Sequence, residues 1–423
     1  MRPQPLSGIR VADFSHVMAG PYASHLLRLL GAEVIKIEAR TRGDAMRYYG
    51  ADRRYDGMAP AFIAANAGKK SIALDLKDPD DRATANAIIA RSDVLLENFR
   101  PGVMTRLGFG YDAVRELRPD IVYCSVSGYG QSGPLRDWPA IDNIVQATSG
   151  MMSLGGDPGD PPMRVGFPLV DTLTGQTAAF AILSALLRRE RSGGGDYIDV
   201  AMFDATLAFM ASAVVPYLVT GRALERTGNV GYSGQPTSAV FEAGDGRLIS
   251  LGVVQQGQFE VLARFLGQED WLTDPRFLTP DLRRHNSEAM QEALGAVLRR
   301  KPAAEWEQAM SAAGIPCGMV REVGEGATLP HLDKRGLKLT VHIPGLPERE
   351  DVEVLGTGFR LGDATETTID PPPRHNEHEA AIRAWLAEGE EHDDEDMASD
   401  DGDGGRNDDV DDGASPAFRI DPA

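Results

Sequence analysis

Short apolar runs alternate with longer amphipathic stretches along the first half of the chain. Helical patterns such as Pro21–Leu30, Asp80–Arg91 and Gln176–Arg191 lie between the apolar runs. The runs with the length and β-branched content of buried strands are Ile9–Phe14, Val34–Ile37, Ser71–Leu76, Val94–Phe99, Ile121–Val126 and Tyr197–Val200. This alternation predicts a Rossmann-like α/β domain, in which helices cover both faces of a parallel sheet.

The pattern changes after residue 221. The Gly-rich segment Gly231–Pro236 is followed by a short predicted strand, Leu248–Leu251, and then by amphipathic helices between Gln258 and Ala313. Short strands return after Pro316. We therefore predict a large domain built from both chain ends, with residues 1–221 as its first part and 326–387 as its return segment, and a smaller inserted α+β domain at 222–325.

Charge is concentrated at the C-terminal end. Fourteen acidic residues and one Arg lie between Glu388 and Gly413, in a chain whose net charge is −20. Apolar side chains are too few there to offset the conformational entropy that the segment would lose on ordering. Residues 388–423 are therefore predicted to be a disordered acidic tail. It is either a solubilising extension or a docking segment for a basic partner. The overall charge has the wrong sign for binding nucleic acid or an anionic membrane.

The cysteines and the apolar stretches indicate a soluble cytoplasmic protein. Cys124 and Cys317 are the only cysteines, which argues against a disulfide framework and for a reducing compartment. The first residues have no apolar signal core. The longest apolar stretch, Ala205–Val219, contains Pro216 and is shorter than the ~20 residues of a membrane span.

Most familiar chemical motifs are missing or stand in the wrong context. Gly128–Gly133 matches G-x-G-x-x-G, but it runs into Pro134 instead of opening a helix, which argues against a dinucleotide site. The sequence has no Walker loop, no H-E-x-x-H, no paired C-x-x-C and no nucleophile elbow. His375 and His378 have no third ligand nearby, so we expect surface or capping roles for them. Neither a metal nor a cofactor is predicted.

Asp171 is the most informative single residue. It stands in the segment GFPLVDTLTG, just before a strong helical pattern that begins near Thr174. One interpretation is a helix N-cap. The other is a carboxylate nucleophile, which the positive end of the helix would keep ionised at pH 7 without a separate base.

Several ordered motifs resemble the class III coenzyme A transferases of CaiB/BaiF type. The resemblance runs from about Leu6 to the Pro371–His378 exit. The matching motifs are ADFSHVMAGPYASHLLRLLGAEVIKIE, Gly43-Asp44, NAGKKSIALDLK, ENFRPG and SGYGQSGP. This family includes formyl-CoA transferase and 2-methylacyl-CoA racemase.

The resemblance implies a covalent mechanism at Asp171. In the family the corresponding Asp attacks an acyl-CoA thioester and forms an acyl-aspartyl anhydride, then an aspartyl-CoA thioester, from which the acceptor acid takes the coenzyme A. The resemblance also implies an interlinked homodimer. Small mono- or dicarboxylic acids are the expected acceptors and succinyl-CoA the expected donor, with their identity left open.

By the same resemblance, the coenzyme A site lies in the N-terminal half. Its expected residues are Val17, Met18, Ala19, Arg40, Leu74, Lys77, Asn98, Phe99 and Arg106. The segment Gly231–Pro236 resembles a mobile glycine loop, which makes Tyr232, Gly234 and Gln235 candidate substrate residues, although a simple interdomain loop is equally compatible.

Two alternatives to a transferase are open. A racemase needs a second proton carrier, and family racemases use a His where this chain has Ile141. Isoleucine cannot carry a proton, which favours the transferase. In the other alternative, the chain is a non-catalytic CoA-binding subunit in which Asp171 only caps a helix.

Overall fold

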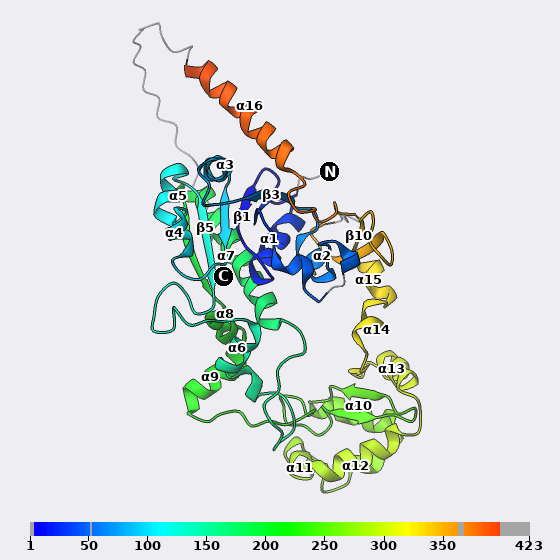
Figure 1. The fold of residues 1–423 in the computed structure, drawn as a ribbon. Helices are drawn as coiled ribbons and strands as arrows, with labels where there is room; N and C mark the ends of the chain where they lie inside the picture. The colour runs from blue at the N-terminus through cyan, green and yellow to red at the C-terminus, as the bar shows by residue number, and fades with distance from the viewer. Residues whose placement is uncertain (1–3, 51–52, 363–367, 398–423) are drawn as a thin grey trace, which may run out of the picture. The chain divides into compact units, whose positions relative to one another are not determined.

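The computed structural model describes residues 4–50, 53–362 and 368–397, with side chains described as far as residue 388 (Figure 1). The chain forms two units, one ending at His378 and one beginning at Glu379. The second contains helix α16 (Glu379–Met397). The predicted tail boundary at residue 388 therefore falls inside a helix, and residues 398–423 lie outside the described part of the chain.

A six-stranded parallel sheet forms the centre of the first unit. Its strand order is β3-β2-β1-β4-β5-β6 and every neighbouring pair is parallel, as the apolar runs predicted. All residues of β4 and β5 are buried, which is typical of a sheet covered on both faces. The strands are β1 (Arg10–Asp13), β2 (Glu33–Ala39), β3 (Lys70–Leu74), β4 (Val94–Glu97), β5 (Val122–Ser127) and β6 (Asp196–Ala201).

Helices α1 and α7 pack together against this sheet. Leu27 of α1 and Ile182 of α7 share one core with Val94 and Cys124 of the strands. The helices contact closely because a Cβ at Gly175 of α7 would lie 2.7 Å from the carbonyl oxygen of Ala19. The helices of this region are α1 (Ala19–Leu29), α2 (Pro60–Asn66), α3 (Pro79–Ala90), α4 (Val103–Leu107), α5 (Tyr111–Leu117), α6 (Asp142–Thr148), α7 (Leu169–Ser192), α8 (Met202–Phe209) and α9 (Ala211–Thr220), with short 3₁₀ turns η1 (Ala45–Tyr48), η2 (Arg53–Tyr55) and η3 (Met151–Ser153).

Helix α7 is long and apolar enough to cross a membrane by composition alone, and the pair α8 and α9 passes the same test with a 79° bend. Half of the apolar window of α7 is buried inside the protein. Its packing on α1 and the sheet is that of a core helix.

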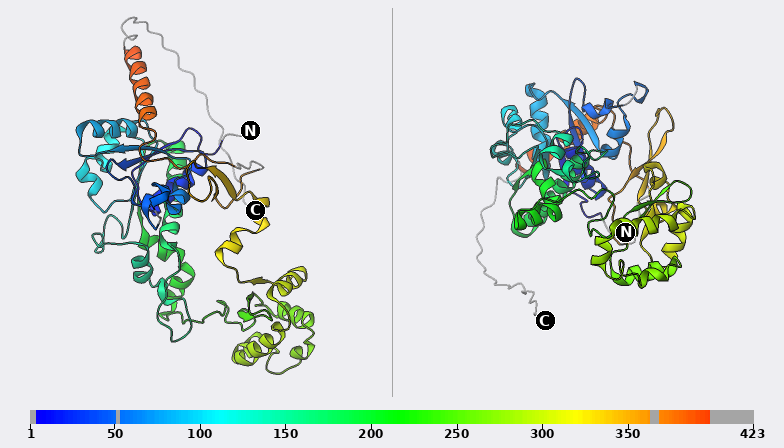
Figure 2. Two further views of the ribbon diagram at one scale, coloured as in Figure 1. Left: turned by 45° about the vertical axis from the view of Figure 1, so that its right-hand side comes forward. Right: turned by 90° about the horizontal axis from the view of Figure 1, so that it is seen from below.

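A second core lies between Ala239 and Ile315 (Figure 2, green to yellow). An antiparallel three-stranded sheet packs there with helices around Phe259, Leu294 and Trp306. Its elements are β7 (Val240–Glu242), β8 (Leu248–Leu251), β9 (Cys317–Met319), α10 (Gln256–Phe265), η4 (Glu269–Leu272), α11 (Pro280–His285), α12 (Ser287–Leu298) and α13 (Ala303–Ala312). The separate-domain bounds at 222–325 stay a prediction.

After the second core the chain forms α14 (Val323–Ala327), which spans the predicted boundary at 325/326, then α15 (Pro330–Arg335) and an antiparallel hairpin of β10 (Lys338–His342) and β11 (Asp351–Leu355). The exit residues 371–378 then run beside the central sheet. His378 donates its amide to Ser71 of β3 at 2.9 Å, and His375 Nε2 donates to the carbonyl of Ala39 at 3.1 Å. These two histidines fasten the exit segment to the sheet edge.

Candidate active site

The strand order reverses between β1 and β4, and parallel α/β sheets bind ligands at such a point, beyond the carboxyl ends of the strands. The loops that follow these two strands contain the predicted residues Val17, Met18, Asn98 and Phe99. The sheet topology thus brings together two motifs that are far apart in the sequence.

Asn98 clamps the backbone of the first loop. Its amide donates to the carbonyl of His16 at 2.8 Å and its Oδ1 accepts from the amide of His16 at 2.8 Å. The rings of His16 and Phe99 lie 4.9 Å apart. The two loops therefore form one rigid unit.

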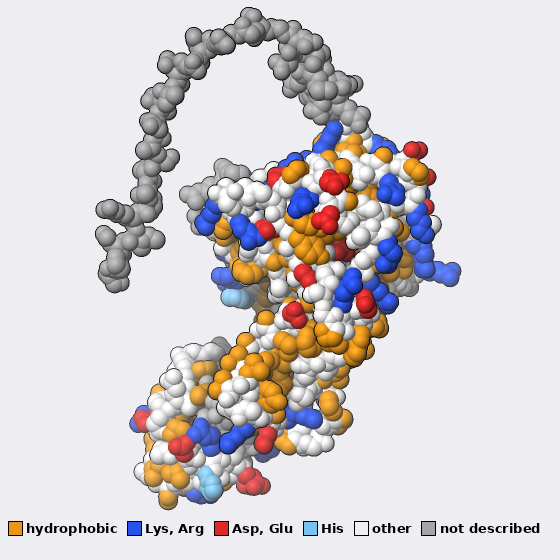
Figure 3. Space-filling model, turned by 90° about the vertical axis from the view of Figure 1, so that its left-hand side faces the viewer, with side chains coloured by type: hydrophobic (Ala, Val, Ile, Leu, Met, Phe, Trp, Pro, Cys, Tyr) orange, Lys and Arg blue, Asp and Glu red, His pale blue; other side chains and the backbone are white. Residues whose placement is uncertain are grey.

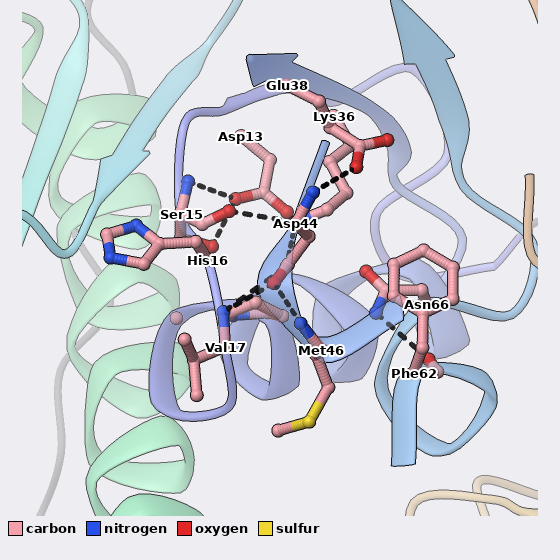
Figure 4. A network of polar contacts seen from close by, with 12 residues as sticks. Asp13, Ser15, His16, Val17, Lys36, Glu38, Asp44, Met46, Phe62 and Asn66 are labelled. Carbon is pink, nitrogen blue, oxygen red and sulfur yellow. Dashed lines mark hydrogen bonds and ion pairs between the residues drawn. The ribbon is translucent and has the colours of Figure 1, made fainter. Parts of the chain in front are cut away.

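Val17 has a backbone conformation that β-branched residues rarely adopt, with φ at +66°. Its amide donates to Asp44 Oδ1 at 3.0 Å, and the carboxylate of Asp44 also accepts from the amide of Met46 (Figure 4). Lys36 contacts the same region, donating to the carbonyl of Ser15 at 2.8 Å. Contacts from three sides hold residues 15–17 in place, and strain that is held in this way is common at ligand sites.

Helix α1 starts directly after this loop. Met18 precedes the helix, and no side chain caps its first turn. Within the described chain, no backbone hydrogen bond uses the amides of Ala19 and Gly20, two buried residues at the positive end of the helix dipole. Such a turn suits an oxygen that gains negative charge during a reaction.

Asp171 is the third residue of α7, which begins at Leu169 and not near Thr174 as the sequence predicted. The N-cap interpretation of Asp171 is therefore wrong. The first turn is satisfied by Asp142 of α6, whose Oδ2 accepts from the amides of Val170 at 2.7 Å and of Asp171 at 3.1 Å.

A second set of bonds holds Asp142 in position. Its Oδ1 accepts from Gln146 Nε2 at 2.6 Å, and Gln146 Oε1 accepts from the amide of Val165 at 2.9 Å. Asp142 is the site residue that the sequence analysis missed. The only sequence signal for it is an acidic residue at the start of a short helical pattern.

Burial, and to a smaller extent the neighbouring carboxylate of Asp142, together raise the pKa of Asp171 to about 7. The sequence analysis expected the opposite, a carboxylate kept ionised by the helix. The helix start does not prevail because Asp142 already occupies the first amides and adds a like charge. Among the described residues, no Lys or Arg forms an ion pair with Asp171.

Asp171 and Gly175 are four residues apart and so share one face of α7. Gly175 lies against the start of α1, where an added Cβ would meet Ala19 and, at 3.0 Å, the ring of Tyr22. The predicted nucleophile is therefore one helical turn from the part of α7 that touches the start of α1.

The predicted phosphate and adenine contacts have different surroundings. Arg106 and Lys77 are exposed, whereas Leu74 is only 1% exposed and offers almost no surface to a ligand. Arg40 donates to both oxygens of Asp81 at 2.5 and 2.6 Å, so its charge is already compensated. Their roles with coenzyme A stay predictions.

Arg136 is a basic residue that the sequence analysis did not select. A Cβ at Gly102 would lie 3.3 Å from Arg106 Nη1 and 3.8 Å from Arg136 Nη2, so two guanidinium groups flank one glycine beside the Asn98 loop. Within the described ranges, neither forms an ion pair. Two uncompensated positive charges at one place suit a phosphate.

The Gly-rich segment precedes the second core and is hydrogen-bonded to α11 at its edge and to α9. Gln235 is 2% exposed and its Nε2 donates to the carbonyl of Pro280 at 3.2 Å, while Tyr232 is 79% exposed. Gly234 has φ at +66°, which suits glycine. No hydrogen bond in the described part of the chain joins these residues to Asp171.

No group of three or more His, Cys, Asp and Glu among the described residues could hold a metal ion. The expectation of a metal-free reaction stays a prediction. Three features can take part in chemistry or binding: the Asp171 carboxylate, the amides at the start of α1, and the neighbouring guanidinium groups of Arg106 and Arg136.

Comparisons with known proteins show the family to which the chain belongs. The sequence model described as "CoA-transferase family III" matches residues 6–379. The chain is 41% identical over 347 residues to the acetyl-CoA:oxalate CoA-transferase of Acetobacter aceti, covering 81% of this chain and 88% of that protein. It is 34% identical over 346 residues to the succinyl-CoA–D-citramalate CoA-transferase of Chloroflexus aurantiacus, covering 82% of this chain and 86% of that protein.

A solved structure shows the same fold. The crystal structure of a CAIB/BAIF family protein from Brucella suis matches with a TM-score of 0.81 and 31% sequence identity, over 91% of this chain and 100% of that chain.

Proposed function

Because the chain belongs to CoA-transferase family III and is a CoA-transferase acting between acids, we propose that it transfers coenzyme A through covalent intermediates on Asp171. The observation that carries this proposal is the half-buried Asp171 carboxylate, which has no cationic partner among the described residues and a pKa near 7. A buried carboxylate that no cation neutralises is poorly solvated and therefore reactive as its anion.

The reaction has two symmetrical halves. The Asp171 carboxylate attacks the thioester carbonyl of the donor, the C–S bond breaks, and an anhydride and the CoA thiolate result. The thiolate then attacks the aspartyl carbonyl of the anhydride, releasing the donor acid and leaving an aspartyl-CoA thioester. The carboxylate of the acceptor acid reverses these steps, which leaves acceptor acyl-CoA and free Asp171.

The loop around Val17 and the start of α1 suit the thioester end of this ligand. The amides of Ala19 and Gly20 would stabilise the oxyanion of each tetrahedral step. Asn98 fixes the loop, and Arg106 with Arg136 would hold phosphate groups of the nucleotide end.

The acceptor is a carboxylic acid and the donor an acyl-CoA, for which we propose succinyl-CoA. The two relatives compared above are named for oxalate and D-citramalate as acids. A racemase is disfavoured because Ile141, at the N-cap of α6 beside Asp142, has no group that accepts a proton.

The proposed homodimer has a physical rationale in the exposed apolar side chains of α8 and α9. Phe209, Leu218 and Val219 are 63%, 72% and 78% exposed. Hydrophobic side chains gather on the face shown in Figure 3. Apolar patches of this kind commonly mark interaction surfaces.

Mass spectrometry with a trapping nucleophile tests the mechanism. Wild-type protein incubated with acyl-CoA and hydroxylamine should yield a mass shift at Asp171, and Asp171→Ala should lower CoA exchange by at least ~10³-fold. Asp204→Ala is the matched control, because Asp204 is also the third residue of a helix but is exposed. Wild-type exchange rates in Asp171→Ala would refute the mechanism.

A further inference from the structure

We propose that an apolar pocket beside Met18 binds the hydrocarbon chain of an acyl group, so that the acids this protein uses include monocarboxylic acids with apolar chains. This inference rests on the proposed function. It concerns a cavity that the covalent chemistry itself does not require.

The cavity has a volume of about 460 Å³, which is within the usual range for small-molecule sites. Its walls come from α1, α2 and the β10–β11 hairpin. The apolar residues that line it are Met18, Leu26, Leu29, Pro60, Ile63, Ala64, Leu346, Val352, Val354 and Leu355. Such a lining favours a hydrocarbon chain by removing apolar surface from water.

The pocket begins at the candidate active site. Met18 and Tyr22 line it, and Tyr22 is the residue against which Gly175 of α7 packs, one turn after Asp171. The pocket therefore begins at a residue that lies against α7 one turn after Asp171, and the proposal takes this end as the entry for the acyl group.

The pocket then follows one face of α1. Met18, Tyr22, His25 and Leu29 recur at intervals of three to four residues, the spacing of a single helix face. From Met18 to Leu29 the helix rises by roughly 16 Å, enough to accompany an extended chain of many carbons.

The two carboxylates at the rim of the pocket are already paired. Glu348 pairs with Arg54 at 3.4 Å and accepts from the hydroxyl of Tyr55 at 2.7 Å, and Glu353 pairs with Lys338 at 3.3 Å. Because these partners compensate the rim carboxylates, the preference for a hydrocarbon chain comes from the apolar walls.

His25 forms part of the pocket wall and is 1% exposed. Burial lowers its pKa to about 3, so the ring is neutral, while the backbone of Ala67 acts on the pKa in the opposite direction. A neutral imidazole adds no charge to the wall, which suits an apolar ligand.

Chain-length dependence tests the proposal. Exchange from succinyl-CoA would be measured for unbranched monocarboxylic acids of increasing length and for short dicarboxylic acids. For wild-type protein we expect kcat/KM to rise with chain length. Ala64→Trp, which places an indole in the pocket, should lower the ratio of kcat/KM for long over short acids by at least ~10-fold.

Ala304→Trp is the matched control, an exposed helical Ala in α13 outside the pocket, and it should leave that ratio unchanged. Exchange with short acids but no length preference, or no change of the ratio in Ala64→Trp, overturns the pocket and leaves the proposed function standing. A changed oligomeric state of Ala64→Trp with the ratio intact would assign the cavity to a second copy and also overturns the pocket. No exchange with any acid refutes the proposed function itself.

Discussion

Asp13 at the end of β1 is fully buried and Asp171 of α7 is half-buried, and the two carboxylates have different neighbours. Asp13 Oδ2 accepts from Ser24 Oγ at 2.6 Å and pairs with Lys69 Nζ at 3.2 Å. Asp171 faces the carboxylate of Asp142. Burial alone would raise the pKa of both carboxyl groups.

The balance of neighbours decides the outcome. For Asp13, the charges of Lys69 and Lys36 and the bonds from serine hydroxyls outweigh burial and lower its pKa. For Asp171, no group in the described part of the chain opposes burial, and its pKa rises to about 7. A carboxylate whose charge is balanced by cations and hydrogen bonds, like Asp13, has a structural role. A carboxylate without such partners, like Asp171, is less stabilised as its anion and therefore more reactive.

The largest expected effect follows from removing the compensation at Asp13. Lys69 is fully buried and donates to Asp13, Ser24, Asn66 and the carbonyl of Pro21. Burial lowers its pKa to about 8, so it is still mainly charged at pH 7. Lys69→Met should lower the free energy of unfolding by about 3–5 kcal/mol in urea denaturation, because it leaves Asp13 without its nearest cation.

Lys70 offers a control at the next position. It pairs with Glu33 at 2.5 Å, but its side chain is 47% exposed. Lys70→Met should cost less than ~1 kcal/mol. If Lys69→Met lowered the free energy of unfolding by no more than Lys70→Met does, the buried contacts of Lys69 would not contribute to stability.

The strands of the central sheet were predictable because each of them coincides with a short apolar run in the sequence. The predicted Ser71–Leu76 and Ile121–Val126 became β3 and β5 within two residues at each end. The start of α7 was not predictable in this way. Its first amides are satisfied by Asp142, 29 residues earlier, so no local cap marks Leu169.

The sequence could select candidate site residues but not the electrostatics around them. Motif matching selected Val17, Asn98 and Asp171, and the strand order brings the first two together. The pKa of Asp171 depends on a residue of another helix, and the burial of Leu74 depends on tertiary packing. Neither can be read from spacing along one chain.

The next largest effect is expected in the pH dependence of kcat/KM, which tests the role of Asp142. Only ionised Asp171 attacks a thioester, so kcat/KM should rise with pH through about 7 and level off above it. Asp142→Asn removes the like charge while an amide oxygen can still accept from α7. The pKa of Asp171 should fall, and the midpoint of the pH profile should move to lower pH, with a severalfold gain at pH 6 relative to pH 8.

Asp137→Asn is the control for this profile, since Asp137 is exposed on the loop before α6. The position of the midpoint reports charge, whereas a change in the plateau reports altered geometry. A midpoint that stays in place in Asp142→Asn would show that burial alone sets the pKa of Asp171.

The smallest expected effect is a change in the free energy of unfolding caused by substituting Val17, in the loop between β1 and α1. Val17 is 40% exposed and has φ at +66°, a conformation that costs about 1–3 kcal/mol for a non-glycine residue. Val17→Gly relieves that strain, but glycine loses about 0.5–1 kcal/mol more backbone entropy on folding. The free energy of unfolding should therefore rise slightly, by roughly 1 kcal/mol.

Val323 is the matched control, a 90% exposed valine at the start of α14 with an ordinary backbone conformation. Val323→Gly should lower the free energy of unfolding by up to about 1 kcal/mol, so the two substitutions have opposite signs. A loss of stability in both would mean that the Val17 backbone is not strained. With the expected signs, a raised KM for acyl-CoA in Val17→Gly would show that the strained loop is held in shape for the ligand, as the fixed carboxylate of Asp44 beside it suggests.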